Sequence, residues 1–160
     1  MTKVFIAGAS GNVGRTIVRT IGKRPGFELA GGWCLEAGRD LGLLAGLGEL
    51  GVAAAADLEE GLRATKPDLV FDFAVTQVLK NDMETYLKLG LDAVIGTTGL
   101  TDEELAPFKA QVKAKGLRWS VAPNYGLGMN LAAAFVKMAR KYYPYITIID
   151  KHTQEMANAP

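Results

Sequence analysis

Three glycines near the start of the chain have the spacing of a phosphate-binding loop. They stand in the segment Gly8-Ala-Ser-Gly-Asn-Val-Gly14, directly after a β-branched and aromatic run. Glycine allows a tight turn, a close approach to a pyrophosphate and close packing of the next helix against a sheet. That helix would offer free N–H groups and its positive dipole end to the phosphates. The predicted cofactor-binding residues here are Gly8, Ser10, Gly11, Asn12, Val13 and Gly14. A strand-to-helix turn without a ligand is the structural alternative.

The end of the second predicted strand bears on the choice between NADH and NADPH. An acidic residue about 20 residues beyond the glycine loop usually binds the ribose hydroxyls of the unphosphorylated cofactor. This chain has Trp33, Cys34 and Leu35 at that place, followed by Glu36 and then Arg39. Glu36 would suit NADH, whereas Arg39 would suit a 2′-phosphate. The cofactor is therefore predicted as NADPH or NADH, with the choice left open.

The elements that must position this loop alternate along the chain. Short apolar runs predict strands at residues 3–7, 28–33, 69–73, 92–95, 117–121 and 146–149. Apolar residues at helical spacing predict helices around residues 13–21, 78–87, 105–112 and 131–142. Asp57 and Thr101 are predicted N-caps, with glutamates three residues later. The glycine-rich stretch 36–51 has no clear period and is compatible with a flexible flap.

This alternation predicts an α/β fold, a Rossmann-type doubly wound and mostly parallel sheet with helices on both faces. Ligands bind such sheets at the carboxyl edge, where the strand order reverses. We therefore expect the site to be built from the loops at 8–14, 73–77, 96–99 and 122–128. Residues 1–160 are expected to form one dinucleotide-binding domain.

Composition narrows the classes of partner. Lysine and arginine exceed aspartate and glutamate by one, and this near-balance disfavours a nucleic-acid partner. The single cysteine, Cys34, leaves no internal disulfide and no cysteine-rich metal site, and no metal is predicted. No apolar run is long enough for a membrane span, and no signal-peptide layout precedes the first strand. A cytoplasmic protein is expected.

Two later motifs resemble those of dihydrodipicolinate reductase, a lysine and diaminopimelate pathway enzyme. They are Gly96-Thr-Thr-Gly99 and the segment Ala122-Pro-Asn-Tyr-Gly-Leu-Gly-Met-Asn130. The resemblance also takes in the glycine loop and the strand end at Phe73. It implies that NADPH or NADH lies with its nicotinamide end near Phe73, Gly96, Thr97, Thr98, Ala122, Pro123, Asn124 and Tyr125. Threonine and asparagine supply neutral donors and acceptors for a ribose and a carboxamide.

The same resemblance places the catalytic segment near the end of the chain. His152 matches the family's first catalytic histidine, which is implicated as the proton donor to a cyclic dicarboxylate imine. Thr153 replaces the second histidine, Met156 a lysine and Asn158 an aspartate. The family's substrate and tetramer-forming domain is expected to be absent from this chain. A homo-oligomer remains open.

Three functions follow as hypotheses. The first is an NAD(P)H-dependent reductase of this family, weak or inactive as the chain stands, because its acid and substrate anchors are substituted. The second is a non-catalytic dinucleotide-binding module, and the third a reductase for a different imine or carbonyl substrate. The glycine spacing also suits short-chain reductases, but no tyrosine here has their lysine four residues later.

Overall fold

The computed structural model describes residues 1–149 of the chain. Its contacts divide the chain into two compact units, Met1–Pro123 and a second that begins at Asn124. The two are described separately. The first unit contains the sheet and all but one of the helices in the described range.

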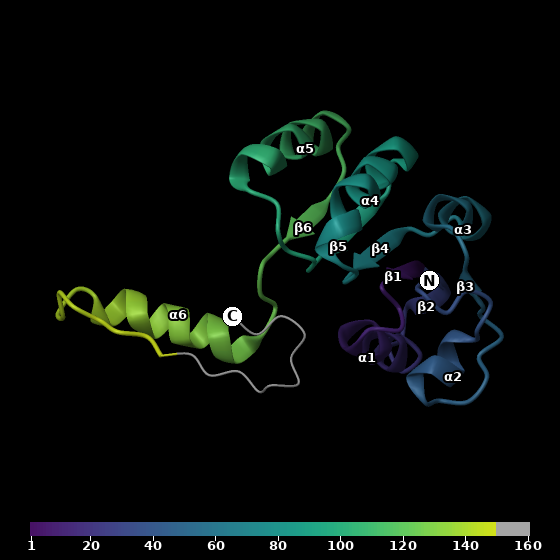
Figure 1. The fold of residues 1–160 in the computed structure, drawn as a ribbon, viewed down its shortest axis with the longest axis horizontal. Coiled ribbons are helices and arrows are strands. Elements are labelled where there is room, and N and C mark those ends of the chain that lie inside the picture. Colours follow the sequence, from purple (N-terminus) through teal and green to yellow (C-terminus); the bar gives the residue numbers. More distant parts are fainter. Residues whose placement is uncertain (150–160) are drawn as a thin grey trace. The chain divides into compact units, whose positions relative to one another are not determined.

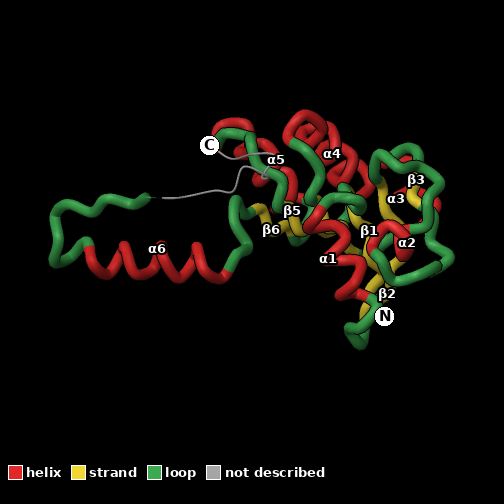
Figure 2. Tube along the Cα trace, turned by 60° about the horizontal axis from the view of Figure 1, so that its bottom comes forward, coloured by secondary structure: helices red, strands yellow, loops and turns green. Residues whose placement is uncertain are grey.

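The first unit is built on a six-stranded sheet in the order β3-β2-β1-β4-β5-β6, and every neighbouring pair is parallel. The strands are β1 (Thr2–Ala7), β2 (Phe27–Trp33), β3 (Ala54–Ala55), β4 (Leu69–Asp72), β5 (Asp92–Ile95) and β6 (Trp119–Val121). A helix separates each strand from the next, as the alternation of red and yellow in Figure 2 shows. The predicted Rossmann-type fold is thereby confirmed. The order reverses between β1 and β4, which places the ligand crevice there.

Both faces of the sheet carry a buried apolar cluster. The helices of this unit are α1 (Asn12–Ile21), α2 (Leu41–Ala45), α3 (Leu58–Thr65), α4 (Thr76–Leu89) and α5 (Asp102–Ala114). Phe5 and Ala7 of β1 pack with α3, α4 and α5, whereas Val4 and Ile6 pack with α1 and α2 (Figure 1). Alternate side chains of a strand point to opposite faces. The central strand is consequently apolar and buried from Val4 to Ala7, as expected of a strand covered on both faces.

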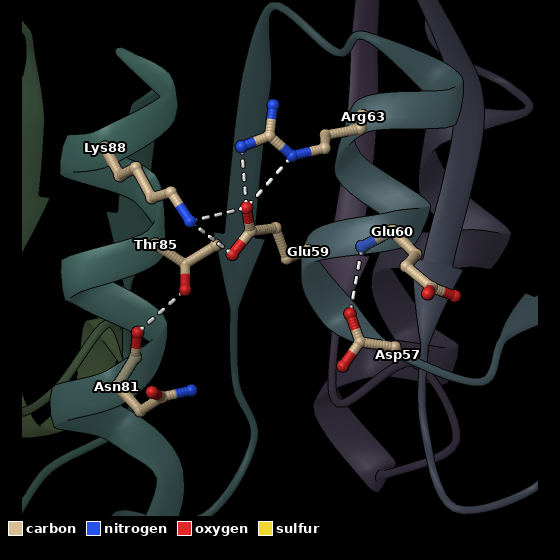
Figure 3. Close-up of polar contacts among 7 residues, drawn as sticks. All are labelled: Asp57, Glu59, Glu60, Arg63, Asn81, Thr85 and Lys88. Atoms are coloured by element: carbon tan, nitrogen blue, oxygen red, sulfur yellow. Dashed lines mark hydrogen bonds and ion pairs between the residues drawn. The ribbon is translucent and has the colours of Figure 1, made fainter.

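The predicted helix caps are present. Asp57 accepts a hydrogen bond from the Glu60 N–H at 2.9 Å and begins α3 (Figure 3). Thr101 and Glu104 form the reciprocal capping box of α5. Glu59 joins the two helices of the same face by ion pairs, because it contacts Lys88 of α4 as well as Arg63 of its own helix. These pairs lie at the surface and stabilise the arrangement only modestly.

The segment 36–51, for which a flexible flap was one interpretation, contains the short helix α2 and a defined set of hydrogen bonds. Asp40 organises it, since its carboxylate accepts hydrogen bonds from the backbone N–H groups of Gly42, Leu43, Leu50 and Val52. These bonds lower the pKa of Asp40, with the Leu50 N–H contributing most. An aspartate at a helix N-cap forms such bonds readily, but α2 is too short to show a period in the sequence.

The second unit holds α6 (Leu127–Ala139), which has no buried residue within the described chain. The strand predicted at 146–149 is not formed there, and its isoleucines at 148 and 149 are 69% and 79% exposed. A strand needs a neighbour for its backbone groups, and apolar composition does not supply one. Within residues 1–149, no helix combines the length and hydropathy needed to span a bilayer.

Candidate cofactor-binding site

The glycine loop is packed so closely that side chains are excluded at two of its positions. Gly8 has φ +79°, and a Cβ atom on it would lie 2.7 Å from the carbonyl carbon of Phe73. A Cβ on Gly14 would lie 2.8 Å from the Cα of Ala9. The loop after β1 therefore packs closely against the residues that follow β4 and against the first turn of α1. This is the packing predicted for a loop that approaches a pyrophosphate.

The N-terminus of α1 is open to a ligand. Gly11 is its N-cap and provides no side-chain cap, and its first turn holds no acidic residue. Gly11, Asn12 and Val13 are all exposed. The Gly11 N–H donates to the Gly8 carbonyl oxygen at 3.1 Å, whereas the N–H groups of Asn12 and Val13 belong to the first turn of α1, which has no intrahelical acceptors for them and lies at the positive end of the helix dipole. Arg15 adds a positive charge beside the loop, where its Nε donates to the carbonyl oxygen of Ser10.

The buried face of α1 is offset from the apolar spacing that predicted this helix. Val13, Ile17 and Ile21 have that spacing, but Val13 is 48% exposed. The helix buries Gly14 and Val18 together with Ile21. Gly14 lacks a side chain and so lets the helix approach, which turns the buried face by one residue from that expected. Val13 is left on the loop side, where it was also predicted to contact the cofactor.

Glu36 lies beside the glycine loop at the end of β2. Hydrogen bonding from the Ser10 side chain lowers the pKa of Glu36 most, and the Cys34 thiol and the charge of Arg15 lower it further. Its Oε2 atom is buried and has no hydrogen-bond partner within the described residues. A charged carboxylate oxygen at the position of Glu36 Oε2 fits a donor such as a ribose hydroxyl. The neighbouring Cys34 remains a thiol, because burial raises its pKa. Arg39 is exposed.

The loops after β4 and β5 are in contact through packing and a hydrogen bond. A Cβ on Gly96 would lie 2.6 Å from Cδ1 of the Phe73 ring and still nearer to its Cε1, so that ring packs directly on the loop backbone. The Thr76 hydroxyl donates to the carbonyl oxygen of Thr98 at 2.7 Å. A pocket of about 300 Å³ opens here, and its lining includes Thr97, Thr98, Ala122 and Pro123. The first unit thus brings together the predicted residues from three strand ends.

A buried polar cluster under these loops was missed by the sequence analysis. Asp72, the last residue of β4, is fully buried, and its carboxylate accepts hydrogen bonds from Thr97 Oγ1 at 2.6 Å and Tyr86 Oη at 2.8 Å. Asp82 is 2% exposed, and burial together with the charge of Asp72 raises its pKa to about 7. The sequence did contain a signal for this cluster. Asp72 interrupts an apolar strand, and Asp82 lies among the apolar residues of a predicted helix.

Three predicted residues fall outside this arrangement. Asn124 and Tyr125 belong to the second unit, where Asn124 Oδ1 accepts a hydrogen bond from the Gly126 N–H at 2.6 Å and so turns the chain into α6. His152 lies outside the described residues. Within residues 1–149, no cluster of histidine, cysteine and carboxylate side chains could hold a metal ion.

The chain was compared with known families and proteins. The family described as "Dihydrodipicolinate reductase, N-terminus" matches residues 2–125. A 4-hydroxy-tetrahydrodipicolinate reductase of Desulfitobacterium hafniense is 32% identical over 99% of this chain, and that of Methanothermobacter thermautotrophicus is 31% identical over all of it. The chain spans 60% and 62% of the lengths of these two relatives.

Solved structures agree on the architecture. The dipicolinate-bound dihydrodipicolinate reductase of Paenisporosarcina sp. TG-14 superposes with a TM-score of 0.74 and 28% identity, over 90% of this chain and 55% of that one. A biliverdin reductase of Synechocystis, in complex with biliverdin and NADP⁺, has a TM-score of 0.68 over 88% of this chain and 42% of that one. Its identity is 17%, so it shares the fold only.

Proposed function

Because the chain belongs to the dihydrodipicolinate reductase family, we propose that it is the nicotinamide-dinucleotide-binding part of a reductase of lysine and diaminopimelate biosynthesis. The substrate would be a cyclic imine that carries two carboxylates. The relatives carry the name of that activity, and this chain spans 60% of the length of the first of them.

The observation that carries the proposal is the fit between the glycine loop and a dinucleotide. Gly8 and Gly14 leave no room for side chains, the helix behind them has an open N-terminus, and the loop lies where the strand order reverses. Those three features together form a pyrophosphate site in folds of this kind. The orphaned Oε2 of Glu36 supports the position of the adenosine ribose, at the end of the neighbouring strand.

We further propose a preference for NADH over NADPH. The Glu36 carboxylate lies beside the loop, and its lowered pKa keeps it ionised at neutral pH. A 2′-phosphate next to it would meet like charge, whereas a 2′-hydroxyl could donate to it. Arg15 and Arg39 offset part of this repulsion, so discrimination of about tenfold is expected rather than exclusion.

Each residue group would have a separate role in the reaction. A nicotinamide dinucleotide held here would supply the hydride for reduction of the conjugated imine, and a proton must reach the nitrogen. The glycine loop would hold the pyrophosphate, and Thr97 and Thr98 would bound the pocket for the nicotinamide end. His152 is the proposed proton donor. Met156 and Thr153 cannot replace the cationic groups that the resemblance implies at their positions.

A slow reductase or a purely binding module therefore remains the competing outcome for this chain. Loss of general-acid help alone typically costs about a hundredfold to ten-thousandfold in rate. Turnover in the ordinary range of about 1 to 1,000 per second would show that the substitutions at 153 and 156 are harmless. Turnover on another imine or carbonyl compound would favour a changed substrate.

The test is a titration of the purified chain with NADH and NADPH, followed by NADH oxidation with enzymatically generated substrate. A bulky replacement, Gly11→Leu, should abolish binding of both cofactors by obstructing the helix N-terminus. Glu36→Ala should narrow the gap between the two dissociation constants, and His152→Ala should lower any turnover without weakening cofactor binding. Unchanged affinities in the Gly11 variant would place the site elsewhere.

A further inference from the structure

The carboxylate of Asp72 connects three separate segments beneath the candidate site. Its Oδ1 accepts from Thr97 Oγ1 at 2.6 Å and from the Ala74 N–H at 3.2 Å, and its Oδ2 accepts from Tyr86 Oη at 2.8 Å. Thr97 belongs to the loop after β5, Ala74 to the loop after β4 and Tyr86 to the last turn of α4. One fully buried side chain thus holds both loops that face the predicted nicotinamide end.

Such a group is costly to keep in a protein interior. A buried carboxylate is tolerated when hydrogen bonds and charges compensate it, yet Asp72 has a second carboxylate, Asp82, as its electrostatic neighbour. Tyr86 remains a donor, because burial and the charge of Asp72 raise its pKa well above the ordinary value. An apolar residue would meet the packing need of the strand end at lower cost. A buried polar cluster of this kind next to a pocket points to a role in the site.

The hydrogen bonds restrain a hydroxyl that would otherwise rotate. Thr97 is 8% exposed and directs its Oγ1 to Asp72, and the residue also lines the pocket with Thr98, Ala122 and Pro123. A short bond from a hydroxyl to a carboxylate is among the stronger hydrogen bonds in proteins. The position of the loop backbone at the pocket therefore depends on a residue that cannot itself touch a ligand.

We propose that Asp72 is a positioning residue for the nicotinamide half of the cofactor, through Thr97 and the turn at Ala74. This inference rests on the proposed function, because it assumes that a nicotinamide dinucleotide binds at this edge. The adenosine half lies at the glycine loop and Glu36, on the other side of the reversal point. Asp72 should consequently affect one half of the ligand and leave the other half unaffected.

The experiment compares two probes, NADH and ADP, on the full chain by calorimetric titration. ADP contains the adenosine and the pyrophosphate but neither the nicotinamide nor its ribose. Thr97→Val should weaken NADH about tenfold and Asp72→Asn at least about threefold, while ADP affinity stays within about twofold. Thr97→Ser keeps the hydroxyl and should restore NADH affinity.

Thr85→Val is the matched control, because it removes a threonine hydroxyl of similar burial on α4. That hydroxyl bonds the Asn81 carbonyl oxygen of its own helix at 3.0 Å and lies outside the Asp72 cluster (Figure 3). NADH binding by this variant should match the unmodified chain.

The outcomes separate the two proposals. If the unmodified chain binds neither probe, the proposed function fails and the inference with it. If it binds both, but Thr97→Val and Asp72→Asn leave NADH affinity unchanged, the positioning role alone is overturned. Equal weakening of NADH and ADP would likewise overturn it, because a loss that extends to the adenosine half indicates general unfolding. Thr97→Val keeps the test valid should the Asp72 variant fail to fold.

Discussion

At the scale of single residues, Asp82 shows how burial couples the charge state to stability. Its carboxyl is 2% exposed, its Oδ2 has no hydrogen-bond partner in the described chain, and burial and then the charge of Asp72 raise its pKa to about 7. In the unfolded chain an aspartate titrates near 3.9. The folded state therefore holds this proton more tightly than the unfolded state does, and folding is favoured at lower pH.

We predict that the free energy of unfolding falls by about 3 kcal/mol at most between pH 5 and pH 8, because Asp82 loses its proton in that window. Asp82→Asn keeps the shape without the charge, so it should flatten this dependence and be the more stable form at pH 8. Denaturant unfolding at several pH values measures both effects. Glu84→Gln, an exposed change on the same helix, is the control. An equal slope in the unmodified chain and the Asp82 variant would contradict the prediction.

At acidic pH, the free energy of unfolding is expected to change in the opposite direction and to fall as the pH is lowered. Hydrogen bonds lower the pKa values of Asp40, Glu59 and Glu103, in the first case chiefly from the Leu50 N–H and in the second chiefly from Lys88. Groups of this kind contribute stability above their unfolded pKa and lose it as the pH falls through the folded value. The Asp82 measurement is therefore confined to pH 5 and above.

At the scale of elements, the contact between α1 and the glycine loop decides whether the site forms. Alanine normally stabilises a helix relative to glycine by about 1 kcal/mol. At Gly14 this gain is outweighed, since a Cβ would lie 2.8 Å from the Cα of Ala9 and still nearer to the Gly8 carbonyl oxygen. These are backbone atoms, which cannot turn aside as a side chain could.

Gly14→Ala is expected to destabilise the chain by about 1–3 kcal/mol and to weaken NADH binding at least about tenfold. Gly22→Ala is the matched control at the other end of α1. Its φ is −61°, and no atom lies within 4 Å of an added Cβ, so stability and binding should be preserved. Thermal unfolding and NADH titration of both variants check the pair. If the two variants have the same thermal stability and the same NADH affinity, the close packing around Gly14 is not needed for folding or binding.

At the scale of the whole molecule, apolar burial is unevenly distributed. The first unit holds every buried apolar residue of the described chain, including Leu79 at 1% exposure. The helix α6 buries none, and its Leu131 is 51% exposed. The cost of truncating an apolar side chain depends on how much of it is buried.

Leu79→Ala should therefore lower the free energy of unfolding by about 2–5 kcal/mol, and Leu131→Ala by less than about 0.5 kcal/mol. Chemical denaturation of the two variants measures this contrast, with identical chemistry at both positions. A cost above about 1 kcal/mol at Leu131 would show that α6 is covered in solution.

The sequence alone determined the class of fold and indicated the loops of the candidate site. Alternating apolar strands and capped helices predict a parallel doubly wound sheet, and Asp57, Thr101 and Gly90 begin or end helices as their backbone preferences require. These are local effects, which depend on residues three or four positions apart. The glycine spacing is local in the same sense, and it indicated the loop before any contact was known.

Tertiary structure decided what depends on neighbours that are distant in sequence. The apolar segment 146–149 predicts a strand, but it has no strand beside it in the described chain. Val13 is exposed because Gly14, and not Val13, lies at the buried contact of α1. Asp72 and Thr97 are 25 residues apart, and their hydrogen bond exists only because β4 and β5 are neighbours in the sheet. Local propensity contains no information about such pairings, since a buried carboxylate is favourable only when folding has already placed its donors around it.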